Sequence, residues 1–518
     1  MRQKKILFII GLSLLILSHP SLSILIPSQF DPNGEIRFSL GGEVSVLNPI
    51  LSTDSASSAV EGAIFSGLVR VNEKLEMIPD LATKWEVSKD GKIWTFYLRK
   101  NVKWHDGVQF TAEDVKFTFD SILNPKINSV RRSDYIIEGK PIQFKVADKY
   151  KVQAILPKPY APFLSHAGMS IIPKHLLSGK DINTAEFNRH PVGTGPFIFK
   201  EWKTGDHVTL IRNDNYYFGK PLLAKITYKI IPDENSNLVA LEAGEVDEAG
   251  IPAKDYSRMK KVKEINVFEF DALTYVYLGL NLDSPKFADK RVRQALAYAT
   301  DKKQLVNLIF RGLASPAYAP SAPVSWAYNA NVPKYAYDPE KAKKILKEAK
   351  AENLEFTILV NQGNKEREKA AVILQQQYKK VGVKVKVRVL EWSALLKVIN
   401  APTGPKDFDA VIIGWSLGLD PDGYSIWHSS QYPKGFNFIG YKNPVVDKLL
   451  EQGRTTIDRK GRKAIYAKLW KTIADDQPYI FLWYPKAVSG ISTRVGGLSN
   501  PGPAGMFLNL EKVFISPK

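Results

Sequence analysis

Cysteine is absent from the 518-residue chain. There is therefore no disulfide framework, and no N-terminal thiol that could carry a lipid after processing. Long apolar runs are absent after the first 17 residues, so no later segment has the length and hydrophobicity to span a membrane. Internal repeats and low-complexity linkers are absent as well. A chain of this length without disulfides depends on its core, and it is too long for a single core, which predicts at least two lobes.

The N-terminus has the pattern of a secretory signal. Three cations within the first five residues precede an uncharged apolar run at 6–17, which is too short to cross a bilayer comfortably. Ser21 and Ser23 offer small side chains for cleavage. We expect residues 1–23 to be a signal peptide and the mature protein to be periplasmic. An uncleaved segment would tether it to the membrane.

Acidic residues are outnumbered, and the formal net charge is +19. Such a balance permits contact with nucleic acid or an anionic membrane. The cations are nevertheless interspersed with Asp and Glu, and the densest cluster, at 459–463, stands at a predicted helix start. Solvated helix faces explain this distribution better, so no nucleic-acid partner is expected. A diffuse positive field would still favour docking on the inner membrane surface.

The pattern of secondary structure changes near residue 284. Before it, short strands and turns dominate, and Thr111 is predicted to cap a helix with Asp114 three residues later. Further strands are predicted at 197–199, 207–213, 225–231 and 275–280. After residue 284, helices are predicted near 292–299, 338–349 and 365–380 and from 443 and 458, and strands at 355–360 and 383–389. The second half is thus predicted to be an α/β domain.

The stretch 408–428 contains a buried-strand pattern followed by Gly414-Trp415-Ser416-Leu417-Gly418. This G-x-S-x-G string is typical of the nucleophile elbow of serine hydrolases, in which a helix begins at once after the serine. Here the first helix-start signal is Asp420 before Pro421, so Ser416 is predicted to lie in a loop. The only histidine after it is His428, which gives the wrong triad order. A secreted hydrolase acting through Ser416 is the unfavoured alternative, and no catalytic residue is predicted.

Metal and cofactor motifs are incomplete. His105 and Asp106 lack further ligands at a suitable spacing, and we interpret them as turn residues. The segment 192–196 resembles a phosphate-binding loop only superficially, because no Lys-Ser/Thr follows and no helix begins. Neither a metal site nor a cofactor is predicted.

Several sequence blocks, in a fixed order, resemble the family 5 extracytoplasmic solute-binding proteins that serve oligopeptide and dipeptide ABC transporters. These blocks are residues 67–70, 79–91, 98–107, 192–197, 291–296, 337–342 and 427–431. Each block alone is weak, but together they cover nearly the whole mature chain. The resemblance implies capture of a peptide or other small solute by a monomer and its delivery to an ABC permease in the inner membrane.

The resemblance also implies an α/β clamshell of two lobes with two hinge crossings and an inserted subdomain, of the type II-like periplasmic binding protein class. Lobe I would comprise residues 32–62, 190–283 and 489–518, the inserted subdomain 63–189, and lobe II 284–488. Ligand would lie between the lobes and stabilise the closed form by hinge closure.

Candidate binding residues follow from the same resemblance. The strand end in lobe II would pair with the ligand's main chain as an added strand. Trp415 would form an apolar wall or pack in the core, and Glu43 would receive a cation or remain a solvated loop charge. The candidates are Glu43, Ser45, Tyr275, Tyr277, Gly414, Trp415, Ser416, Leu417, Gly418 and Asp420.

Position 418 departs from the family pattern. Related dipeptide and tripeptide binders have an aspartate three residues after the tryptophan, where it pairs with the ligand's amine, whereas this chain has Gly418. A buried ammonium without a partner is costly. Either Asp420 replaces that aspartate through a shorter loop, or the ligand is longer, or it is not a peptide. Relatives with this fold bind metal chelates, haem and oligosaccharides, so the ligand class stays open.

Overall fold

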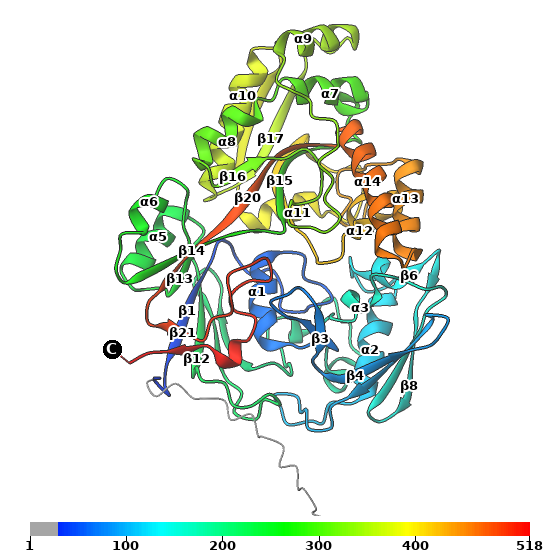
Figure 1. The fold of residues 1–518 in the computed structure, drawn as a ribbon, viewed down its shortest axis with the longest axis vertical. Helices are drawn as coiled ribbons and strands as arrows, with labels where there is room; N and C mark the ends of the chain where they lie inside the picture. Colours follow the sequence, from blue (N-terminus) through cyan, green and yellow to red (C-terminus); the bar gives the residue numbers. More distant parts are fainter. Residues whose placement is uncertain (1–29, 518) are drawn as a thin grey trace, which may run out of the picture.

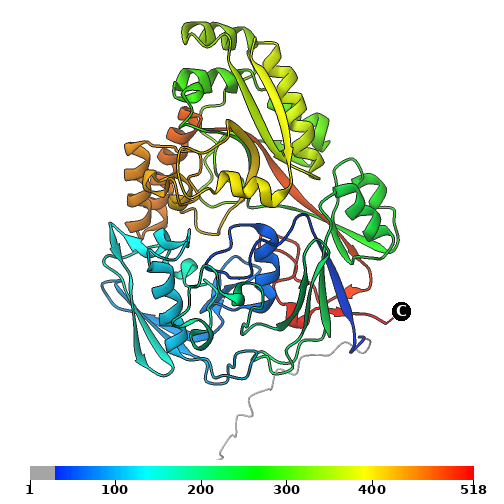
Figure 2. The same ribbon diagram turned by 180° about the vertical axis from the view of Figure 1, so that it is seen from behind.

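The structure, a computed structural model, describes residues 30–517. The predicted signal peptide at 1–23 lies outside this range. Figure 1 shows two bodies, one above the other, joined by long strands, and Figure 2 shows the same arrangement from behind. We use the names lobe I, inserted subdomain and lobe II for the predicted ranges, except that β15 (Thr274–Leu280) is described with lobe II because it pairs with β19 (Ala410–Ser416) and β20 (Tyr479–Ser492). Within residues 30–517, no helix has both the length and the hydrophobicity of a membrane-spanning segment.

Lobe I is built on a mixed sheet in which β1 pairs with β12 in parallel and β10, β11 and β12 form an antiparallel meander. Alternate residues of β1 are buried, as expected for a strand with one face in the core. The elements are β1 (Glu35–Leu40), α1 (Ser55–Ile64), β10 (Phe197–Lys203), β11 (His207–Arg212), β12 (Lys225–Ile230), α5 (Glu234–Glu242), β13 (Glu248–Gly250), α6 (Tyr256–Met259), β14 (Ile265–Asp271) and, from the C-terminal tail, β21 (Val495–Gly496), η5 (Leu510–Lys512) and β22 (Phe514–Ile515).

The glycines of segment 192–196 allow a close approach to α1. A Cβ placed on Gly193 would lie 1.9 Å from the carbonyl oxygen of Ile64, and one on Gly195 would lie 2.7 Å from it. The amide of Gly195 also donates to this oxygen at 2.8 Å. These glycines therefore serve packing and a helix-end hydrogen bond.

The inserted subdomain has a four-stranded antiparallel sheet covered by α2. The predicted cap is confirmed: Thr111 and Asp114 form a reciprocal capping box at the start of α2. One continuous apolar core runs through lobe I and this subdomain, which therefore behave as one body. The elements are β2 (Val69–Val71), β3 (Met77–Pro79), β4 (Ala82–Val87), β5 (Ile93–Leu98), α2 (Ala112–Leu123), η1 (Arg132–Tyr135), β6 (Ile136–Ile137), β7 (Lys140–Pro141), β8 (Gln143–Asp148), β9 (Lys151–Ile155), α3 (Phe163–His166), α4 (Lys174–Leu177) and η2 (Glu186–Asn188).

Lobe II has a mixed sheet with helices on both sides, and one apolar core on each face. The predicted strand–helix–strand unit is present, with β17 and β18 parallel. The elements are β15 (Thr274–Leu280), η3 (Pro285–Phe287), α7 (Lys290–Tyr298), α8 (Lys302–Phe310), β16 (Ala314–Pro316), α9 (Pro339–Glu348), β17 (Glu355–Asn361), α10 (Lys365–Lys379), β18 (Lys384–Leu390), α11 (Trp392–Ile399), β19 (Ala410–Ser416), α12 (Tyr424–Trp427), η4 (Ser429–Gln431), α13 (Pro444–Thr455), α14 (Arg459–Asp476) and β20 (Tyr479–Ser492).

The strand β15 differs from the prediction, which placed residues up to 283 in lobe I. It lies between β19 and β20, and Leu278 and Leu280 are buried in a core of lobe II. The residues of an apolar strand that is buried on both faces do not reveal which strands will pair with its edges. Here the partners are β19 and β20 of lobe II. The first crossing between the lobes therefore falls just before Thr274. The second lies within β20, which pairs with β15 at one end and with β14 at the other.

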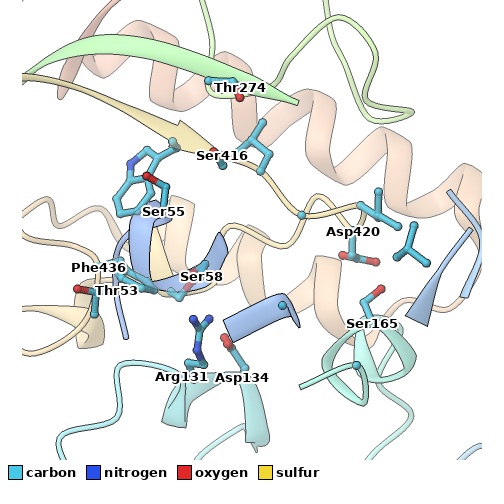
Figure 3. A pocket seen from close by; sticks show the side chains of 18 of the residues that line it. Thr53, Ser55, Ser58, Arg131, Asp134, Ser165, Thr274, Ser416, Asp420 and Phe436 are labelled. Carbon is cyan, nitrogen blue, oxygen red and sulfur yellow. The ribbon is translucent and has the colours of Figure 1, made fainter. Parts of the chain in front are cut away.

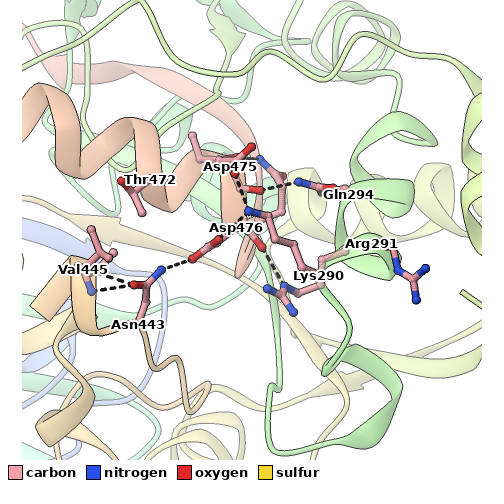
Figure 4. Close-up of polar contacts among 12 residues, drawn as sticks. Lys290, Arg291, Gln294, Asn443, Val445, Thr472, Asp475 and Asp476 are labelled. Atoms are coloured by element: carbon pink, nitrogen blue, oxygen red, sulfur yellow. Dashed lines mark hydrogen bonds and ion pairs between the residues drawn. The ribbon is translucent and has the colours of Figure 1, made fainter.

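A polar junction holds three helices of lobe II together (Figure 4). Asp476, at the end of α14, accepts hydrogen bonds from Asn443, the N-cap of α13, and from Tyr441, both at 2.6 Å. Its other oxygen lies 3.0 Å from Nζ of Lys290, at the start of α7. Burial opposes ionisation of Asp476, but these three donors outweigh it and lower the pKa of the carboxyl. The helices that support the cleft wall are thus fixed to one another.

Candidate functional site

A cavity of about 1060 Å³ lies between the lobes. This is at the upper end of the usual size of small-molecule sites, about 300–1,000 Å³. Its wall combines residues of all three parts, as Figure 3 shows: Thr53 and Ser58 come from lobe I, Arg131 from the inserted subdomain, and Ser416 from lobe II. A ligand here would contact both bodies at once.

The strand β19 leaves one of its edges open along this cavity. On one side it pairs with β15 over its whole length, to Ser416. On the other side, pairing with β17 ends at Val411. Among the described residues, no strand pairs with the second edge of 412–416. Because an unpaired strand edge presents free N–H and C=O groups, it is a template for another extended chain.

The register shows which backbone groups face that edge. The amide of Leu417 donates to the carbonyl of Leu273 at 2.7 Å, so residues 413, 415 and 417 direct their backbone groups toward β15. The backbone groups of Gly414 and Ser416, which alternate with them, point to the open side. Both residues line the cavity. Two pairs of backbone donors and acceptors are therefore available to a ligand.

Trp415 is half-buried: it lines the cavity and also packs against other side chains of lobe II. Its ring packs edge-on against Phe436, at 5.3 Å between centroids, and its Nε1 donates to the hydroxyl of Tyr479 at 3.3 Å. The side chain is thus held in place by lobe II while one face stays open to the cavity. Leu417 and Gly418 follow it along the same wall.

Arg367 is a cavity residue that the sequence analysis missed. It lies in the first turn of α10, and its Nη1 donates to Oδ1 of Asn361 at 2.9 Å. A Cβ placed on Gly414 would lie 3.4 Å from its Nη2, so the guanidinium lies against the open strand end. No carboxylate among residues 30–517 lies within 4.0 Å of it as an ion-pair partner. A polar helix position gives no sequence signal for this role.

Two acids, Glu234 and Glu366, attract the guanidinium of Arg367 from a longer distance, but they do not fully compensate its positive charge. Burial raises the pKa of Glu234 to about 7 and that of Glu366 to about 8. Neither residue lines the cavity. Burial also lowers the pKa of Arg367 from its usual value, because a desolvated cation without an ion-pair partner is unfavourable. The site thus has an arginine that would gain from a carboxylate ligand.

Of the two predicted tyrosines, only Tyr277 reaches the cavity. Tyr277 lines the cavity and stacks on Tyr479 with 3.7 Å between ring centroids. Tyr275 is fully buried next to it and does not reach the cavity wall. Both lie on β15, the partner strand of β19. Their packing fixes the sheet under the open edge.

Glu43 and Ser45 lie away from the cavity wall. The carboxylate of Glu43 accepts hydrogen bonds from Nε1 of Trp202 at 3.0 Å and from the amide of Gly205 at 2.6 Å. Ser45 donates to the carboxylate of Asp54. Both side chains are thus engaged within lobe I, and their predicted role in ligand binding has no direct geometric support.

The loop after Ser416 turns differently from the prediction. The helix does not start at Asp420: α12 begins at Tyr424, because Oδ1 of Asp420 accepts the amide of Asp422 at 3.0 Å and forms a turn there. Both oxygens of Asp420 also accept from Arg462, at 2.6 and 2.7 Å. Asp420 lines the cavity but is engaged by an arginine of its own lobe.

Ser416 lacks the surroundings of a hydrolytic nucleophile. It was predicted to lie in a loop, but it is the exposed last residue of β19, because its pairing with Thr274 extends the strand. No histidine among residues 30–517 forms a hydrogen bond with it. His428 instead contacts Ser430 at 2.8 Å. No group of three possible metal ligands is present in the described part of the chain.

Comparison with known proteins identifies the family. The model of bacterial extracellular solute-binding proteins, family 5, matches residues 76–437. The oligopeptide-binding protein AppA of Bacillus subtilis is 39% identical over 496 residues, covering 92% of this chain and 90% of that protein. The chain belongs to solute-binding protein family 5. A dipeptide-binding protein of Escherichia coli is 31% identical, over 88% of this chain and 90% of the relative.

Solved structures of family 5 proteins share the fold. The structure of Bacillus subtilis AppA with a nonapeptide has a TM-score of 0.88 at 37% identity, covering 93% of this chain and 99% of that one. The structure of NikZ from Campylobacter jejuni with Ni(L-His) has a TM-score of 0.85 at 31% identity, covering 93% and 100%. The predicted α/β clamshell of two lobes is thereby confirmed.

In this family 5 protein, the inserted subdomain contacts lobe II through buried charges. Arg454 of α13, only 3% exposed, pairs with Asp422 at 2.8 Å and lies 3.6 Å from Asp134 of the subdomain. Its Nη1 donates to the carbonyl of Ser133 at 2.9 Å, and the amide of Ala161 donates to the carbonyl of Arg454 at 2.9 Å. We call this set of contacts the inter-lobe clamp.

His166 completes the inter-lobe clamp. Its Nε2 lies 3.7 Å from Oδ2 of Asp422, and its ring stacks on Tyr160. Burial lowers the pKa of His166, but Asp134 and Asp422 outweigh burial and the repulsion from Arg454, so the pKa is raised. Protonation of this histidine therefore stabilises contact between the two bodies.

Proposed function

We propose that this chain is the extracytoplasmic, periplasmic binding component of an ABC importer, which captures oligopeptides between its lobes and delivers them to a membrane permease without catalysis. The observation that carries the proposal is the open edge of β19 along the cavity. Backbone groups of Gly414 and Ser416 would hydrogen-bond the main chain of an extended peptide. Because such bonds do not depend on side chains, one site can accept many sequences.

Two further features support a peptide ligand. Arg367 lies at the end of the open edge, where it would receive a carboxylate, and Trp415 presents an apolar wall beside it. The relatives whose names state a ligand include binders of oligopeptides and dipeptides. Closure of lobe II onto the inserted subdomain would bury the peptide and form the surface that the permease recognises.

The experiment compares two substitutions at one position. Ser416→Pro removes the backbone N–H that faces the cavity and leaves the ladder with β15 intact, because this N–H does not take part in it. Ser416→Ala keeps the N–H and removes only the hydroxyl. Affinity for penta-alanine is measured by calorimetry, and the unliganded thermal midpoint checks folding.

We expect Ser416→Ala to bind like the wild type and Ser416→Pro to bind roughly 5- to 100-fold more weakly, which is the effect of about 1–3 kcal/mol for an unsatisfied buried group. Equal binding by Ser416→Pro would contradict strand addition. Cleavage of the peptide by the wild type, lost in Ser416→Ala, would instead establish a hydrolase.

A further inference from the structure

The acidic side chains that line the cavity are Asp54, Asp80, Asp134, Asp420, Asp422 and Glu511. All except Asp134 accept a hydrogen bond from another residue of the protein. A carboxylate whose oxygens are occupied gains little from a ligand's ammonium group. Whether each of these carboxylates is occupied therefore decides what part of a ligand the cavity can recognise.

The two acids of lobe II are fully engaged. Both oxygens of Asp420 accept from Arg462 in a bidentate pair. In Asp422, Oδ2 accepts from Nε of Arg454 at 2.8 Å, and Oδ1 accepts from the amide of Tyr424 at 3.1 Å. Neither carboxylate replaces the aspartate that is missing at Gly418.

The acids of lobe I and the tail are engaged as well. Oδ1 of Asp54 accepts the amide of Ser57 at 2.9 Å, and Oδ2 accepts the hydroxyl of Ser57 at 2.8 Å. Glu511 lies 3.4 Å from Nη1 of Arg70. These acids are only 5–7% exposed, which leaves little surface for a ligand.

Asp80 resembles them, because it is 5% exposed and its Oδ1 accepts the hydroxyl of Tyr217 at 2.5 Å. Asp134 differs from the rest, because its carboxylate accepts no hydrogen bond from any of the described residues. Its side chain is 17% exposed, its distance to Nη2 of Arg454 is 3.6 Å, and Figure 3 shows its carboxylate beside the cavity. It is the single acid whose engagement is loose enough to need a direct test.

Arg367 shows the opposite balance. Its side chain has only the neutral amide of Asn361 as a hydrogen-bond acceptor, and Nη2 has no acceptor among the described residues. Arg131, which also lines the cavity and has no ion pair among residues 30–517, donates to the carbonyls of Pro49 and Ser52. The cavity thus has at Arg367 a cation without a nearby carboxylate in the described part of the chain, whereas five of its six acids already accept hydrogen bonds. This difference favours a negatively charged group on the ligand over a positively charged one.

We propose that the cavity recognises its ligand by a carboxylate at Arg367 and has no subsite for an amino terminus. This inference rests on the proposed function and narrows the ligand class: peptides with a blocked amino end bind as well as free ones. The amine of a free peptide stays hydrated, because burial without a partner would be costly.

The test uses penta-alanine in four forms, with either end free or blocked by N-acetylation or C-amidation, and measures each affinity by calorimetry. We expect acetylation to change the affinity less than threefold and amidation to weaken it at least tenfold. In Arg367→Gln, the peptide with a free C-terminal carboxylate should bind more weakly, while the amidated peptide should bind as it does to the wild type. The difference in affinity between the free and the amidated peptide should therefore disappear.

Asp134→Asn is the matched variant. We expect it to weaken the binding of the free and the acetylated peptide equally, because it loosens the inter-lobe clamp in the same way for both. A tenfold or larger loss on acetylation in the wild type would overturn the inference, and disappearance of that loss in Asp134→Asn would assign the amine subsite to this residue. If none of the four forms binds, the proposed peptide function itself fails. If they bind but amidation has no effect, only the carboxylate subsite fails.

Discussion

Replacing Arg454 by glutamine should weaken ligand binding although Arg454 does not line the cavity. Its contacts with Ser133 and Asp134 exist only when lobe II meets the inserted subdomain. A hydrogen bond that involves a charged group contributes about 1.5–3 kcal/mol. Because only the closed form holds ligand tightly, that loss should raise the apparent dissociation constant roughly 10- to 150-fold.

The matched control is Arg293→Gln. Arg293 is also a buried arginine of lobe II, but it donates to the carbonyls of Phe287, Ala288 and Asp476, all within that lobe. Both substitutions should lower the thermal midpoint, whereas only Arg454→Gln should weaken penta-alanine binding by calorimetry. Small-angle scattering should also show a more open unliganded form for Arg454→Gln alone. Equal affinities of the two variants would refute the reasoning.

Two further predictions concern pH and packing. Because the pKa of His166 is raised in the closed form, closure takes up a proton, so penta-alanine affinity should be greatest below the ordinary histidine pKa of about 6.5 and fall as pH rises through the raised pKa. His166→Gln should flatten this dependence, and an unchanged profile would exclude His166. Gly193→Ala places a Cβ 1.9 Å from the carbonyl of Ile64 and should cost about 1–3 kcal/mol in urea unfolding. Gly62→Ala, in open space on α1, should instead stabilise by about 0.5–1 kcal/mol; equal effects would contradict the packing argument.

Local features of the fold were predictable because local chemistry decides them. The capping box at Thr111 and the strand at 383–389 each depend on neighbouring residues, and the structure has both, the strand as β18 (Lys384–Leu390). The place of β15 was not predictable, since the sequence of an apolar strand does not reveal which strands pair with it. That depends on β19 and β20, which follow more than 100 residues later.

The candidate site likewise has parts that could be predicted from the sequence and parts that could not. The strand end from Gly414 to Gly418 was identified through family motifs, and the structure places it on the cavity wall. The engagement of Asp420 was not foreseeable, because its partner Arg462 comes from another helix. Arg367 was missed for a related reason: its place on the cavity wall beside Gly414 depends on how α10 packs against the sheet.

The 14-residue strand β20 belongs to both bodies of the clamshell. Its first residues pair inside lobe II and its last residues pair with β14, so opening the cleft has to bend a continuous backbone. A single shared strand permits rotation about its own middle, near Pro485, but resists sliding or separation of the two sheets, since either would break the ladder. The cleft therefore opens by a rotation of the two lobes as rigid bodies, which leaves the pairing within each sheet unchanged.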